Sequence, residues 1–170
     1  MQTQDILEDL VFGAEDIKGR LIMNKIKWII DEKEINSTII ENVEEYFGIK
    51  FPEDYKQCVL KNHGGSPIPH VFTIDGSEEM INNLIPFTEG SPYNMINTFK
   101  GVSDRLENHI IPFGIDPGGN LLCFDYRGDK EFPSIVFWHH EKAFLERDDA
   151  VIKVSDTFTE FLNSLYEDED

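Results

Sequence analysis

Apolar residues in the N-terminal third of the chain recur at the three- and four-residue spacing of a buried helix face. We therefore predict an amphipathic helix over residues 16–33 and a loosely attached extension over residues 1–15. The apolar residues that fall near one face of this predicted helix are Leu21, Ile22, Ile26, Ile29 and Ile30.

A second helical pattern begins after Asn36 or Ser37, either of which can serve as the N-cap residue because its side chain accepts a backbone hydrogen bond. Gly48 ends this pattern, since glycine tolerates the left-handed conformation found just past a helix. The inward-facing residues of this segment are Ile39, Ile40, Val43 and Phe47.

A third helix is predicted from Pro52, which suits the first turn of a helix, to the Gly64-Gly65 pair. Tyr55 would face the core. We interpret His63 as a residue at the helix C-terminus, where the helix dipole favours it, rather than as a catalytic base.

The hydrophobic pattern changes from helical to strand-like after Gly65. We predict strands over residues 71–74, 83–87, 110–115, 121–126, 134–139 and 151–154. Two of these strands flank Asp116-Pro117-Gly118-Gly119, a sequence typical of a hairpin turn. The strand over residues 134–139 is apolar on both faces, which places it inside the sheet.

Two more helices complete the predicted fold. One covers residues 91–106, and the other follows Ser155 or Asp156 as its cap. The order of helices, an antiparallel sheet and a closing C-terminal helix predicts a single α+β domain over residues 16–166, followed by an acidic tail over residues 167–170.

The composition adds a strong charge signal. The chain has 33 acidic and 15 basic residues, a formal net charge of -18. Such a field repels nucleic acids and anionic membranes and attracts basic proteins. We therefore expect no nucleic-acid or membrane partner. The alternative is that the acidity confers solubility alone.

Targeting signals are not evident, so we expect a cytoplasmic protein. The first ten residues are acidic and lack the apolar run of a signal peptide. No apolar stretch approaches the roughly 20 residues that span a bilayer. The chain is 40% hydrophobic, which is enough for a core of its own.

Catalytic and metal-binding motifs are not evident either. Cys58 and Cys123 lie in apolar stretches and are expected in the core. His139 and His140 are adjacent, so on a strand they would point to opposite faces. We expect no metal, no cofactor and no enzymatic activity. A hydrolase that uses Asp116 and Asp125 is the remaining enzymatic hypothesis.

Three stretches resemble the SUKH superfamily of bacterial immunity proteins, which has relatives among yeast cell-wall assembly regulators. The first is residues 39–48, with the sequence IIENVEEYFG. The second is FPEDYK at residues 51–56, which runs on to NHGG at residues 62–65. The third is IPFG at residues 111–114, followed by GGN at 118–120 and LCFD at 122–125. Phe51 stands where the family usually has leucine.

The resemblance implies an α+β domain that binds and neutralises a cognate toxin, often a nuclease, of a bacterial polymorphic toxin system, without catalysis or a cofactor. The family motifs specify the fold and do not mark the toxin-binding site. The yeast relatives suggest a second hypothesis, a scaffold or regulatory module with an endogenous partner.

Contacts with a basic toxin can therefore be predicted only from charge and expected exposure. We expect the partner-binding residues on loops of the sheet half of the domain. They are Asp75, Glu78, Glu79, Glu89, Tyr93, Asp116, Asp129 and Glu131.

Overall fold

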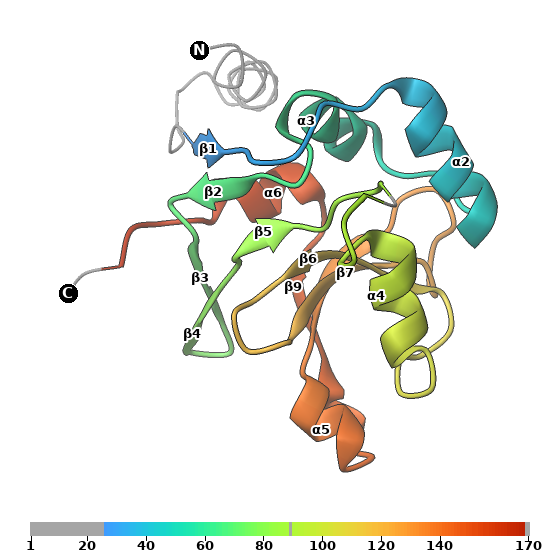
Figure 1. The fold of residues 1–170 in the computed structure, drawn as a ribbon. Coiled ribbons are helices and arrows are strands. Elements are labelled where there is room, and N and C mark those ends of the chain that lie inside the picture. The colour runs from blue at the N-terminus through green and yellow to red at the C-terminus, as the bar shows by residue number, and fades with distance from the viewer. Residues whose placement is uncertain (1–25, 89, 169–170) are drawn as a thin grey trace.

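The computed structural model describes residues 26–88 and 90–168 of the chain (Figure 1). Its helices are α2 (Ser37–Phe47), α3 (Glu53–Asn62), α4 (Met95–Val102), α5 (His140–Phe144), the 3-10 helix η1 (Asp148–Ala150) and α6 (Phe158–Asn163). Its strands are β1 (Lys27–Ile29), β2 (Ser66–Ile68), β3 (Val71–Ile74), β4 (Ser77–Met80), β5 (Asn83–Leu84), β6 (Ile110–Ile115), β7 (Leu121–Asp125), β8 (Ser134–Trp138) and β9 (Val151–Ser155). The fold is a single α+β domain, as the sequence predicted.

The main sheet has five antiparallel strands in the order β5-β6-β7-β8-β9. The predicted hairpin of β6 and β7 is confirmed, and its register shifts once, between Pro112 and Gly114. β8 lies inside the sheet, with β7 and β9 on its two sides, as its apolar sequence predicted. Two smaller antiparallel pairs, β1-β2 and β3-β4, complete the strands of the described residues.

An aromatic core joins the helices to this sheet. The ring of Tyr55 on α3 lies 4.9 Å from that of Phe124 on β7 and 5.2 Å from that of Phe158 on α6, measured between centroids. Phe113 on β6 stacks on Phe124 at 4.4 Å. Burying such rings contributes much of a small domain's stability. Cys58 and Cys123 are buried free thiols in the same core, as predicted.

The first two described helices form where the sequence predicted them. The Asn36 side chain accepts a hydrogen bond from the Ile39 amide at 3.1 Å and so begins α2. Gly48 ends α2 in the left-handed conformation, with a φ of 69°. α3 begins directly after Pro52, whose fixed φ suits a helix start.

The predicted helix over residues 16–33 is wrong where the structure describes it. Lys27–Ile29 form strand β1, and Trp28 pairs with Pro67 of β2. Burial alternates along β1, with Trp28 buried between two exposed neighbours, which is the period of a strand. A Cβ on Gly65 would lie only 3.0 Å from Cε3 of Trp28, so this glycine lets the indole approach. The predicted extension over residues 1–15 lies outside the described residues.

Smaller differences concern the ends of elements. β5 and α4 are shorter than predicted, and Thr157 caps α6 in place of Ser155 or Asp156. The sequence analysis missed β2, β4 and α5. After α6 the chain pairs with β3 through Tyr166, next to the predicted acidic tail.

His63 connects three separate segments of the domain. Its Nδ1 donates to the Lys33 carbonyl at 2.8 Å, and its Nε2 accepts from the Phe87 amide at 2.8 Å. Only the neutral ring can make both bonds, because a protonated Nε2 cannot accept. Burial lowers the pKa of His63 below its usual value, despite the opposing effects of the Lys33 carbonyl and Glu32. The dipole effect expected from the sequence is therefore not the dominant one.

We predict that His63 makes the domain less stable in mild acid. The unfolded chain takes up this proton near its ordinary pKa of 6.5, whereas the folded chain resists it. Stability is thus present above pH 6.5 and falls as the pH drops below it. Urea unfolding of His63→Gln at several pH values should give a lower but flatter profile between pH 7.5 and 5.5. The exposed His70→Gln is the control, and an equally flat profile for it would contradict the prediction.

Two tyrosine variants should shift stability in opposite directions. The Tyr55 hydroxyl is buried and meets no hydrogen-bond partner in the part of the chain that the structure describes. The Tyr126 hydroxyl donates to the Lys50 carbonyl at 2.7 Å. Tyr55→Phe should raise the free energy of unfolding by about 1 kcal/mol, and Tyr126→Phe should lower it by about 1 kcal/mol. Chemical unfolding followed by the fluorescence of Trp28 and Trp138 measures both, and a loss in Tyr55→Phe would be the contrary result.

Candidate partner-binding surfaces

The β3-β4 hairpin presents three of the predicted acidic residues. Asp75 and Gly76 both have positive φ, at 48° and 79°, and form the tight turn that the sequence indicated. Asp75 and Glu78 are exposed, whereas Glu79 is half-buried. Burial and the nearby Asp116 raise the pKa of Glu79, with His139 and Lys142 acting in the opposite direction. Of the three, Asp75 and Glu78 are thus the carboxylates most available to a partner.

The C-terminal segment supports this hairpin. The backbones of Val71 and Tyr166 exchange two hydrogen bonds, at 3.3 and 2.9 Å. The Tyr166 hydroxyl bonds Thr73 at 2.6 Å and donates to Glu78 at 2.9 Å. Tyr166 therefore positions the Glu78 carboxylate, and Glu167 follows it directly along the chain.

Asp116 and Tyr93 line one small hollow of about 360 Å³. The Asp116 carboxylate accepts from the amides of Gly118 and Asn120, at 2.8 and 2.7 Å, and from the Asn120 side chain at 2.8 Å. Asp116 is only 8% exposed, so these bonds shape the β6-β7 turn and leave little of the carboxylate for a partner. Tyr93 is 75% exposed and offers its whole ring.

Asp129 and Glu131 lie on the loop between β7 and β8. Asp129 accepts from the amides of Glu131 and Phe132, at 2.8 and 3.0 Å, and these bonds lower its pKa. Both residues are exposed. Glu89 lies outside the described residues. The structure thus places Asp116 near both Glu79 and Tyr93, whereas Asp129 and Glu131 lie on a different loop. The role of the predicted contact residues remains a prediction.

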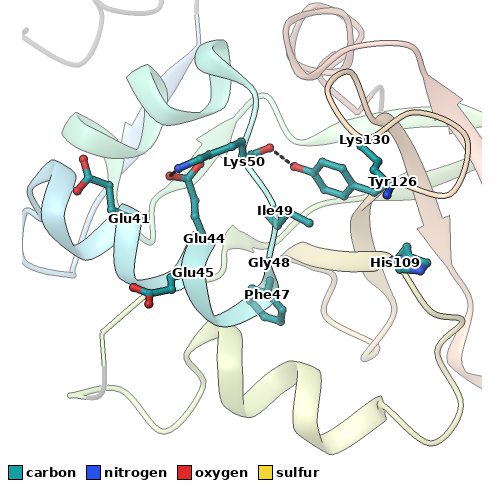
Figure 2. Close-up of a pocket in the computed structure, with 10 residues that line it drawn as sticks. All are labelled: Glu41, Glu44, Glu45, Phe47, Gly48, Ile49, Lys50, His109, Tyr126 and Lys130. Carbon is teal, nitrogen blue, oxygen red and sulfur yellow. Dashed lines mark hydrogen bonds and ion pairs between the residues drawn. The ribbon is translucent and has the colours of Figure 1, made fainter.

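A groove that the sequence analysis missed lies between the C-terminal half of α2 and the start of the β7-β8 loop (Figure 2). Its volume is about 740 Å³. We call it the α2 groove, and its lining residues are Glu41, Glu44, Glu45, Phe47, Gly48, Ile49, Lys50, His109, Tyr126 and Lys130. The acidic side chains of α2 stand on one side, and His109, Tyr126 and Lys130 stand on the other (Figure 2).

Glu44 is the structural member of this acidic wall. It is 2% exposed, and its carboxylate accepts from the Phe51 amide at 2.7 Å. Lys56 lies 3.2 Å away and Lys50 4.0 Å away. The carboxylate therefore ties the end of α2 to the start of α3, because its Oε2 meets both the Phe51 amide and the Lys56 ammonium, which lie beyond the helix.

Glu41 and Glu45 are different, because both are exposed. Neither has a Lys or Arg nitrogen within 4.0 Å among residues 26–88 and 90–168. The last turn of α2 contains no basic residue. Negative charge at a helix C-terminus opposes the helix dipole, so Glu45 is held at an unfavourable place.

Chemistry beyond binding finds little support in the described geometry. Within the described ranges, no group of three or more His, Cys, Asp or Glu side chains could hold a metal ion. Asp125 is the last residue of β7, and Asp116 lies in the turn before the first, so the two are roughly 15 Å apart at the rise of a strand. Partial burial raises the pKa of Asp125, but the hydrogen bonds and charge of Arg127 outweigh this and lower it overall. The carboxylate pair of the hydrolase hypothesis is not brought together.

A comparison with known protein families gives a match over most of the described residues. The structure defines the chain as an α+β domain built on an antiparallel sheet. Residues 34–164 match the SMI1 / KNR4 family (SUKH-1), so the chain belongs to this family. A comparison with curated proteins gives no match. Among the described residues, no helix is long and apolar enough to cross a membrane.

We predict that the two neighbouring glutamates of the groove differ sharply in their effect on stability. Glu44→Ala leaves Lys56 and the Phe51 amide without their buried partner, so the free energy of unfolding should fall by about 3 kcal/mol. Glu45→Ala removes an exposed charge from the wrong helix end, so it should change stability by less than about 0.5 kcal/mol, in the stabilising direction. Urea unfolding measures both, and similar losses in the two variants would contradict the distinction.

Proposed function

We propose that this chain is a bacterial immunity protein that binds and neutralises a cognate toxin domain of a polymorphic toxin system. Membership of the SMI1/KNR4 (SUKH-1) family supports an immunity-like or SMI1/KNR4-type protein-interaction role. The net charge of -18 favours a basic partner, such as a nuclease toxin, whose substrate is itself an anion. The protein acts by binding, in the cytoplasm, without a cofactor.

We choose the β3-β4 hairpin as the docking surface because its exposed carboxylates have no basic partner in the described residues. Neither Asp75 nor Glu78 has a Lys or Arg nitrogen within 4.0 Å in the described part of the chain. The hairpin residues 71–80 include no basic residue at all. Charges that are not neutralised internally project a field into solvent, and such a field speeds the encounter with an oppositely charged protein.

Binding of the acidic hairpin would itself neutralise the toxin, because the hairpin would compete with nucleic acid for the basic cleft. A nuclease toxin needs a basic cleft to hold its nucleic acid, because phosphate contacts dominate that affinity. An acidic hairpin that docks at the rim of such a cleft competes for the same cations. Tyr93, with its exposed ring, is of the residue type that most often anchors an interface.

We predict that reversing the hairpin charges slows association with the toxin. The probe is the C-terminal domain encoded by the neighbouring gene, and the readout is the association rate in surface plasmon resonance. Asp75→Lys/Glu78→Lys should lower this rate about tenfold at low salt, and the difference should shrink as salt rises.

The matched control is Glu141→Lys/Glu146→Lys, which makes the same charge change at exposed positions near α5. If the control lowers the rate as much as the hairpin variant, net charge acts and the hairpin is not the docking face. If the wild-type chain does not bind the neighbouring domain, the toxin proposal fails. A scaffold or regulatory module then becomes the favoured function.

A further inference from the structure

We infer that the α2 groove binds a segment of the partner protein in which a Lys or Arg side chain adjoins an apolar side chain. This inference rests on the proposed function for the identity of the partner. Helix α2, which forms one wall of this groove, lies on the other side of the domain from the β3-β4 hairpin in the view of Figure 1.

The floor of the groove is apolar, which favours an apolar side chain in the bound segment. Phe47 and Ile49 are half-buried and pack against the core from the end of α2. Tyr126 closes the floor, with its hydroxyl fixed on the Lys50 carbonyl at 2.7 Å. Because these side chains are already held in place, an apolar side chain that covers them loses little entropy in ordering the site.

The acidic wall of the groove favours a Lys or Arg side chain in the bound segment. Glu41 and Glu45 are four residues apart on α2, so they stand on one face of the helix. They lack a basic partner within 4.0 Å in the described ranges, and the carbonyl end of α2 adds partial negative charge beside them. A Lys or Arg side chain from the partner could contact both carboxylates and would offset one of their two negative charges.

The opposite wall sets the direction of the segment. Lys130 and His109 line that wall, and Lys130 carries a positive charge. Within the groove, a cation of the bound segment is therefore drawn toward Glu41 and Glu45 on α2 and repelled by Lys130. The groove accepts one orientation more readily than the other, which is how charge confers specificity on an interface.

Two exposed aromatic residues lie close in sequence to residues that line the groove. Tyr46 on α2 is 48% exposed, and the Lys100 ammonium lies 6.0 Å from its ring centroid. Phe132 is 76% exposed and follows Lys130 by two residues on the same loop. Aromatic residues are enriched among those that dominate binding energy, so these two are suited to contact a partner that also binds the groove.

A second copy of this chain is a poorer occupant than a basic partner. Two copies would each bring a formal charge of -18, and they would repel one another at low salt. A partner with basic character meets no such cost.

The test uses random twelve-residue peptides displayed on phage. They are selected on the full wild-type chain and counter-selected on Glu41→Gln/Glu45→Gln, which keeps the shape of both side chains. We expect the enriched peptides to carry Lys or Arg next to a Leu, Ile, Phe or similar residue. Bound peptide should shift the amide NMR signals of Phe47, Gly48, Ile49 and Lys130. Its affinity should fall about three- to tenfold in the double variant, as loss of two exposed ion pairs implies.

Glu141→Gln/Glu146→Gln is the matched control and should leave peptide affinity unchanged. Enrichment of peptides without that pattern, signal shifts that map away from the groove, or no enrichment at all would overturn the inference. Concentration-dependent dimers that mask the groove would overturn it in favour of a second copy. The peptides are independent of the toxin domain, so failure of the groove and failure of the toxin proposal are seen separately.

Discussion

The packing of Tyr55 among phenylalanine rings is the constraint on which the rest of the structure depends. Its ring touches Phe51 in its own segment, Phe124 on the sheet and Phe158 on α6, so one side chain fixes α3 against two other layers. Its hydroxyl has no partner in the described residues, which marks the position as one where ring packing outweighs a lost hydrogen bond. Glu44 then fixes the end of α2 relative to α3, and the end of α2 in turn sets the position of the α2 groove.

Much of the fold could be predicted because its signals are local. The cap at Asn36, the stop at Gly48 and the start at Pro52 each act on neighbouring backbone groups, and the structure confirms the helices that they delimit. The β6-β7 hairpin was likewise predictable from its turn. β1 was not, because an apolar run that includes Trp28 fits a helix face as well as a strand. Its pairing with β2 depends on Gly65, which is distant in sequence.

The candidate surfaces were predictable in part for the same reason. Exposed acids such as Asp75 and Glu78 follow from turn chemistry and charge. The α2 groove does not, since its walls come from residues near position 45 and from His109, Tyr126 and Lys130, which only the folded chain brings together. One signal was present in the sequence: Glu44 and Glu45 sit just before a helix-ending glycine, where acidic residues oppose the dipole. One of them turned out to be buried and paired, and the other exposed and unpaired.

This contrast shows that two neighbouring acidic residues of the domain serve different purposes. Glu44 is desolvated but matched by the Phe51 amide and Lys56, so it secures the join between two helices. The Glu45 side chain has no Lys or Arg nitrogen within 4.0 Å among the described residues, and its charge opposes the dipole at its own helix end. Residues that cost stability without an internal partner are typical of sites that work on other molecules, because selection keeps them for the complex rather than for the free fold. On the β3-β4 hairpin, Asp75 likewise has no Lys or Arg nitrogen within 4.0 Å in the described part of the chain, whereas Glu78 accepts a hydrogen bond from the Tyr166 hydroxyl. Docking at either proposed surface would leave the aromatic core undisturbed, because the rings of that core are buried.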